Sequence, residues 1–122
     1  MARVQLIHWK EDEGRARADE LRELGHTVQY ESDGTAALTL LRRQPVDVIV
    51  IDCTHRLAHG RGAALVLRQR ADTRSVPLVL LGGEARELAT LQGELPGAVL
   101  ADWGGARAAL ENALANPPPF KA

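Results

Sequence analysis

The sequence predicts a three-layer α/β fold, in which helices cover both faces of a five-stranded parallel sheet. Four apolar runs have the length of buried parallel strands and are too short for buried helices. They are residues 4–7, 48–51, 78–81 and 98–101. Segments with helical periodicity fill the gaps between them. This alternation is typical of a parallel sheet, because each right-handed crossover must cover apolar strand surface.

A fifth strand is predicted between the first two apolar runs. Residues 27–30 alternate polar and apolar side chains, as a strand with one drier face does. Such a strand belongs at an edge of the sheet, and in a chain of 122 residues this favours the strand order 2-1-3-4-5. Ligand chemistry in a sheet of this kind belongs at the carboxyl ends of the strands.

Five helices are expected between and after these strands. Asp12 is placed to cap a helix over residues 13–24, and Gly25 is placed to end it. Asp33 and Gly34 open the second helix. The remaining three are expected over residues 61–71, 84–92 and 106–115.

The composition describes a single domain without a nucleic-acid partner. The chain has 15 Lys and Arg against 16 Asp and Glu, which gives a formal net charge of −1. A nucleic-acid binder would instead show a strongly basic face. We expect one domain over residues 1–116. The proline-rich residues 117–122 would then be either a C-terminal tail or the start of a linker.

Cysteine usage and hydropathy favour a cytoplasmic protein. Cys53 is the single cysteine in the sequence, which excludes an internal disulfide and fits a reducing compartment. Its spacing from His8, His55 and His59 matches no recognised zinc pattern, so no metal site is predicted. No apolar run approaches the ~20 residues of a membrane span, and the N-terminus lacks a signal-peptide core.

Several segments, in their order and spacing, resemble the response-regulator receiver domain over about residues 3–114. The strongest is residues 45–52 (PVDVIVID), which looks like the third strand of that family ending in its phosphoacceptor aspartate, with Gly60 eight residues later. The resemblance implies the flavodoxin-like, CheY-like fold. It also implies a role in a two-component phosphorelay, with Asp52 at the phosphoacceptor position.

The chemistry around Asp52 departs from the pattern of the family. The positions of its two acidic metal ligands, its hydroxyl side chain, its switch aromatic and its lysine fall on His8, Trp9, Gly82, Ala98 and Ala101. Trp cannot bind a metal ion, and His is a poor ligand for a hard ion such as Mg²⁺. We therefore expect a degenerate pseudo-receiver that is not an enzyme, holds no metal or other cofactor, and acts by protein–protein interaction.

Two basic side chains are candidate partners for the Asp52 carboxylate. Lys10 and Arg56 both lie in loops at the same sheet edge as Asp52. Because burying an unpaired carboxylate costs free energy, either side chain could pair with it. We hypothesise that one of them makes a fixed contact that locks the pocket in one state. Of the two tryptophans at this edge, Trp9 is expected to fill the emptied metal pocket. Trp103 is either a core residue or an anchor for a partner.

Two other functions stay open. The first is a working receiver that is phosphorylated on Asp52 with the help of Mg²⁺. The second is a flavodoxin-like domain that binds a small ligand through Gly82, Gly83, Gly104 and Gly105.

The partner expected from the resemblance is a protein. A histidine kinase, an output domain and a second copy of this chain all fit, and no membrane or nucleic-acid contact is expected. Receivers commonly use the surface made by the fourth helix, fifth strand and fifth helix, which corresponds here to residues 84–95 and 106–116. This transfer rests on the fold, and a fold does not by itself fix a function.

Overall fold

The computed structural model describes residues 1–118, in which strands and helices alternate. In chain order the elements are β1 (Arg3–Ile7), α1 (Glu11–Glu23), β2 (Thr27–Glu31), α2 (Gly34–Arg43), β3 (Val48–Asp52), α3 (Leu57–Gln69), β4 (Leu78–Leu81), α4 (Ala85–Glu94), β5 (Val99–Ala101), the 3₁₀ turn η1 (Trp103–Gly105) and α5 (Ala106–Ala115). Each predicted strand and helix is present. The turn η1 was not predicted.

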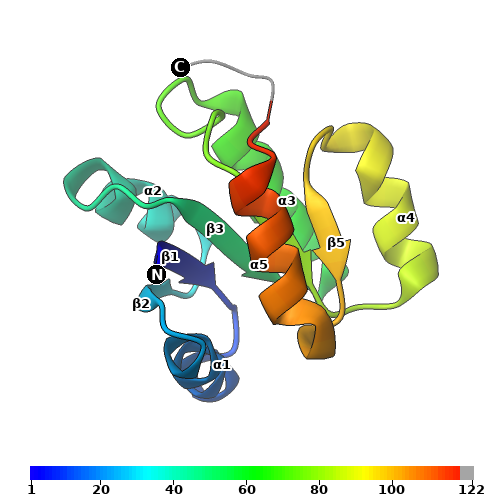
Figure 1. Cartoon of the computed structure of the whole chain (residues 1–122). Coiled ribbons are helices and arrows are strands. Elements are labelled where there is room, and N and C mark those ends of the chain that lie inside the picture. Colours follow the sequence, from blue (N-terminus) through cyan, green and yellow to red (C-terminus); the bar gives the residue numbers. More distant parts are fainter. Residues whose placement is uncertain (119–122) are drawn as a thin grey trace.

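The strands of the described region form one parallel sheet in the order β2-β1-β3-β4-β5, which confirms the predicted order. Figure 1 shows β1 and β3 in the middle of the sheet, with β5 beside α4. The register pairs Ile7 with Ile51 and Asp52 with Leu81. It therefore brings His8, which follows β1, and Gly82, which follows β4, to the same sheet edge as Asp52.

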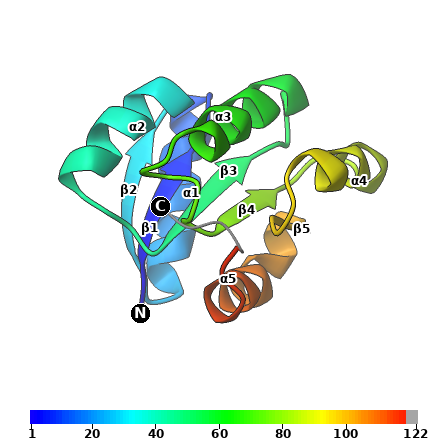
Figure 2. The same ribbon diagram turned by 90° about the horizontal axis from the view of Figure 1, so that it is seen from above.

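Helices cover both faces of the sheet, so the molecule has the predicted three layers (Figure 2). One apolar cluster joins α2, α3 and α4 to one face, and a second joins α1 and α5 to the other. Strand β3 serves both clusters, because Ile49 and Ile51 belong to the first and Val48 and Val50 to the second. This explains why its sequence is apolar without alternation.

Two helices begin earlier than the sequence predicts. Helix α1 starts at Glu11, with Lys10 as its N-cap, so Asp12 lies in the first turn and does not cap the helix. Helix α3 starts at Leu57, four residues before the predicted start. A Cβ at Gly60 would lie 2.8 Å from the Sγ of Cys53, so the first turn of α3 packs tightly on the end of β3. Tertiary packing sets this boundary, and local propensity does not.

The proline-rich end of the chain is described only in part. Pro117 and Pro118 belong to the described residues, and the rest of the predicted tail, residues 119–122, lies outside them. Within residues 1–118, no helix combines the length and the apolar character that crossing a membrane requires.

Helix α5 offers a matched test of the packing. Leu110 is fully buried in the cluster shared with α1, whereas Leu114, one turn later, is 37% exposed. We expect Leu110→Ala to lower the free energy of unfolding by about 3 kcal/mol, because it leaves a cavity. Leu114→Ala should cost less than about 1 kcal/mol. Urea unfolding measures both, and equal costs would contradict the assigned face of α5.

Candidate functional site

The site is built around the carboxylate of Asp52, at the end of β3. Its Oδ1 accepts hydrogen bonds from the Oγ1 hydroxyl of Thr54 at 2.6 Å and from the indole Nε1 of Trp103 at 2.8 Å. Its Oδ2 accepts one from the backbone N–H of Thr54 at 3.2 Å. The side chain is only 1% exposed. Uncharged donors thus replace the water that this buried carboxylate has lost.

The imidazole of His8 occupies the space beside Oδ2. This ring is fully buried, and its Nδ1 accepts a hydrogen bond from the backbone N–H of Lys10 at 3.1 Å. A neutral ring with an accepting Nδ1 carries its proton on Nε2. The Nε2 atom lies 3.3 Å from Oδ2 of Asp52 and 3.6 Å from Oε2 of Glu13. Among the described residues it finds no partner with hydrogen-bond geometry.

Burial sets the charge state of His8. Loss of solvent lowers the pKa of His8 below its ordinary value. The nearby carboxylates of Asp52 and Glu13 act in the opposite direction and only partly offset this effect. The ring is therefore neutral at pH 7, and it presents an N–H bond to the two carboxylates.

Trp103 carries the contact from Asp52 to helix α1. The indole lies in the turn η1, which Asp102 closes by accepting a hydrogen bond from the N–H of Gly105 at 2.8 Å. The guanidinium carbon of Arg17 lies 4.5 Å from the centroid of the Trp103 rings. Trp103 thus donates a hydrogen bond to Asp52 and makes a cation–π contact with Arg17 of α1.

Gly82 and Gly83 make room for the loop after β3. Both have positive φ, at 87° and 81°. A Cβ at Gly82 would lie 2.1 Å from the Oγ1 of Thr54, and one at Gly83 would lie 3.1 Å from the carbonyl oxygen of Cys53. The hydroxyl of Thr54 therefore fills the space that a side chain at position 82 would need. These contacts explain the glycines without a ligand.

Lys10 and Arg56 do not hold Asp52, which corrects the hypothesis drawn from the sequence. The Nζ of Lys10 donates to Oε1 of Glu13 at 3.3 Å, and the guanidinium carbon of Arg56 lies 5.1 Å from the centroid of the Trp9 rings. Within residues 1–118, neither side chain lies within ion-pair distance of Asp52. Long flexible side chains reach several partners, and sequence spacing does not select among them.

The tryptophan that reaches Asp52 is Trp103, whereas Trp9 packs at the rim. The ring of Trp9 meets that of His55 edge-on, with the centroids 6.3 Å apart. His55 also lies 2.6 Å from Glu13, measured from Nε2 to Oε2. The predicted role of Trp9 as the filling of the site belongs instead to His8 and Trp103. No local sequence signal indicates that Trp103 rather than Trp9 contacts Asp52, because the turn η1 positions the indole of Trp103.

Two alanines stand where the receiver pattern has its switch aromatic and its lysine. Ala98 lies just before β5, and Ala101 is the last residue of β5. Ala98 is buried in the apolar cluster that joins α2, α3 and α4 to the sheet. Ala101 is half-buried and lines a pocket between α4 and β5. Gly104 and Gly105 belong to the turn η1.

The donor set around Asp52 does not fit magnesium. Mg²⁺ requires oxygen ligands in octahedral geometry, and the neighbouring positions carry the ring of His8 and the indole of Trp9. A metal bound to the Nε2 of His8 would displace the proton that the Lys10 contact places there. Among residues 1–118, no group of three or more His, Cys, Asp and Glu side chains is arranged to hold a metal ion.

The contact between Gly82 and Thr54 gives a test by double-mutant cycle. Gly82→Ala should lower the free energy of unfolding by about 3 kcal/mol, through positive φ and the clash with Thr54. Gly25→Ala is the control, because its φ is 99° and, apart from Gly25 and its two chain neighbours, no atom of the described chain lies within 4 Å of the added Cβ. It should cost about 1 kcal/mol.

Thr54→Ala removes the clashing hydroxyl, so the double variant Gly82→Ala, Thr54→Ala should cost about 1 kcal/mol less than the sum of the single changes. Urea unfolding of the set measures the coupling. Strict additivity would show that the hydroxyl of Thr54 does not fill this space.

No family model matches the sequence, and no curated protein matches it at a significant level. Solved structures do match over nearly the whole chain. A sensor protein from Polaromonas sp. JS666 is 22% identical with a TM-score of 0.78, and the alignment covers 93% of this chain and 96% of that one.

Two further structures are similar over the same share of this chain. The chemotaxis response regulator CheY4 of Vibrio cholerae is 20% identical with a TM-score of 0.73, covering 93% of this chain and 99% of that one. The receiver domain of a sensor histidine kinase from Pseudomonas aeruginosa, solved with a magnesium ion in its active-site cleft, is 21% identical with a TM-score of 0.69, covering 93% and 98%. This protein therefore has the fold of the response-regulator receiver domains.

Proposed function

We propose that this protein is a receiver-like signalling module of a two-component system that acts by protein–protein contact, without magnesium-dependent phosphorylation of Asp52. The observation that carries the proposal is that both oxygens of the Asp52 carboxylate accept hydrogen bonds from this chain's own donors. In this proposal the protein has no enzymatic activity, needs no cofactor and works in the cytoplasm.

The chemistry of phosphorylation explains why these bonds matter. A carboxylate oxygen must present a free lone pair to phosphorus, and cations must screen the phosphoryl oxygens. Oδ1 of Asp52 already has two donors, and Oδ2 has one donor with the N–H of His8 nearby. The position from which the resembling family supplies a lysine is Ala101. Attack from Oδ1 would require one of its donors to leave. Attack from the remaining lone pair of Oδ2 would require the ring of His8 to move, and position 101 supplies no cation.

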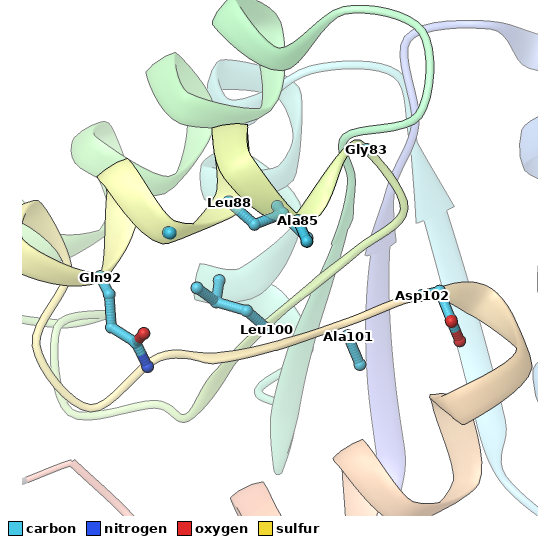
Figure 3. A pocket seen from close by; sticks show the side chains of 8 residues that line it. Gly83, Ala85, Leu88, Gln92, Leu100, Ala101 and Asp102 are labelled. Atoms are coloured by element: carbon cyan, nitrogen blue, oxygen red, sulfur yellow. The ribbon is translucent and has the colours of Figure 1, made fainter.

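The proposed contact surface is formed by α4, β5 and α5. A pocket of about 320 Å³ lies between α4 and β5, and Figure 3 shows its apolar wall. The wall includes Ala85, Leu88, Leu100 and Ala101, with Gln92 and Asp102 as polar neighbours. An apolar pocket with a polar rim suits a protein partner that inserts one apolar side chain. The partner is a histidine kinase, an output domain or a second copy of this chain.

Tryptophan fluorescence tests the absence of phosphorylation, because Trp103 bonds directly to Asp52. Adding Mg²⁺ and beryllofluoride, a phosphoryl mimic, should leave the emission of the wild type unchanged. Incubation with acetyl phosphate should add no phosphoryl group, as measured by intact-protein mass spectrometry. A phosphorylatable receiver treated in parallel verifies the reagents.

Two variants separate the competing functions. Asp52→Asn removes the candidate phosphoacceptor, and Asp47→Asn is a matched change at the other end of the β3 segment. A magnesium-dependent response that survives in Asp47→Asn and disappears in Asp52→Asn would establish a working receiver and refute the proposal. A response to flavin or nucleotide without Mg²⁺ would instead establish the small-ligand alternative.

The contact surface has its own test. Ala89 lines the pocket and is exposed on α4, so Ala89→Arg fills the pocket with a long charged side chain. Thr90→Arg places the same side chain next to it, outside the pocket lining. Partners found in a two-hybrid screen with the wild type should bind Ala89→Arg at least about tenfold more weakly, a loss of about 1.4 kcal/mol in binding free energy. They should keep their affinity for Thr90→Arg. Equal effects of both changes would place the contact elsewhere.

A further inference from the structure

His8 links the end of β1 to the beginning of α1 through its own ring. Its backbone is fixed by the hydroxyl of Tyr30, which donates to the His8 carbonyl oxygen at 2.7 Å. Its Nδ1 accepts from the N–H of Lys10, the N-cap residue of α1. In the described chain, no side chain caps this end of the helix. The imidazole therefore holds a helix terminus that lacks the usual side-chain cap.

Binding a proton would reverse the role of the atom that makes this contact. The neutral ring already carries its proton on Nε2, so a proton from solvent must bind to Nδ1. The charged ring then has two donors and no acceptor. At Nδ1 an N–H would face the N–H of Lys10 across 3.1 Å, and two donors at that distance repel each other. Either the ring turns or the segment of Lys10 moves.

The groups that face His8 act on the charged ring in both directions. Asp52 from β3 and Glu13 from α1 stabilise a positive charge on the ring. Arg17 from α1 and His55 from the loop after β3 oppose it, as does burial, which is the largest of these effects. Tyr30 on β2 donates a hydrogen bond to the backbone carbonyl oxygen of His8. Because burial prevails, the folded state holds the ring neutral until the solution becomes acidic.

We propose that His8 is a proton-operated switch: protonation of its Nδ1 breaks the contact with the N–H of Lys10 and frees the first turn of α1 from the end of β1. This turn carries Glu13, which contacts His55, and the next turn carries Arg17, which lies on Trp103. Movement of the start of α1 thus changes the surface around Asp52. The switch does not depend on phosphorylation, and so it stands apart from the function proposed above.

The direction of the pH dependence follows from burial. Burial lowers the pKa of His8 in the folded protein below the value of about 6.5 that it has in the unfolded chain. The unfolded state therefore binds more protons than the folded state in acid. The stability that the neutral ring contributes is complete above about pH 6.5 and is lost as the pH falls through the lower, folded-state pKa.

Nuclear magnetic resonance of the wild-type protein tests the switch directly. Histidine ¹⁵N shifts should show the proton of His8 on Nε2 at neutral pH. On acidification Nδ1 should gain a proton with a midpoint below about pH 6.5. The amides of residues 10–14 should shift with the same midpoint. Their exchange, corrected for its intrinsic pH dependence, should become about tenfold faster for each pH unit between about pH 6.5 and that midpoint, and should level off below it. Amides of α5 serve as the internal reference.

Variants assign the effect to one ring. His8→Asn keeps an acceptor for the N–H of Lys10 but cannot be protonated, so the shifts at residues 10–14 should disappear. His55→Gln and His26→Gln remove two other histidines, whose rings contact Glu13 and Ala2. In both variants the shifts at residues 10–14 should remain.

Three outcomes overturn the proposal. They are a proton on Nδ1 at neutral pH, shifts at residues 10–14 that persist in His8→Asn, and the absence of any shift when His8 titrates in the wild type. The first and third need no variant, so the proposal can be tested even if His8→Asn fails to fold.

Discussion

The structure depends on how a buried carboxylate is kept satisfied. Asp52 lies at the centre of the sheet edge with almost no exposure, and an ionised group there is costly without partners. Its partners are the hydroxyl and backbone N–H of Thr54 and the indole of Trp103, with the N–H of His8 nearby. They come from the loop after β3, from η1 and from the end of β1. The carboxylate therefore joins the loop after β3 to η1, and the end of β1 packs beside it.

The donors fit around Asp52 because Gly82, which has no side chain, leaves space for Thr54. The hydroxyl of Thr54 reaches Asp52 through space that any side chain at position 82 would occupy. The indole of Trp103 reaches the same oxygen because η1 turns the chain back after β5. The ring of His8 stands on the other side of the carboxylate. The departures from the receiver pattern thus compensate one another within a single site.

The alternation of apolar and helical segments was enough to predict the sheet, its order and the position of Asp52. These features follow from local patterns that a single segment carries. The partners of Asp52 depend on contacts between distant segments, and sequence spacing pointed to Lys10 and Arg56 where the structure has Thr54 and Trp103. The turn η1 was missed because its two glycines carry no apolar periodicity. Helix α3 was predicted too short because packing on β3, and no local signal, sets its start.

The alanines at positions 98 and 101 limit how this edge of the sheet can pass information. Alanine has no side-chain rotamers, so neither side chain can switch between two conformations. If the edge by α4 and β5 exists in two forms, the difference between them must be carried by a displacement of backbone, such as a small translation of α4 across the strand. Such a change would move a whole helix rather than turn one ring.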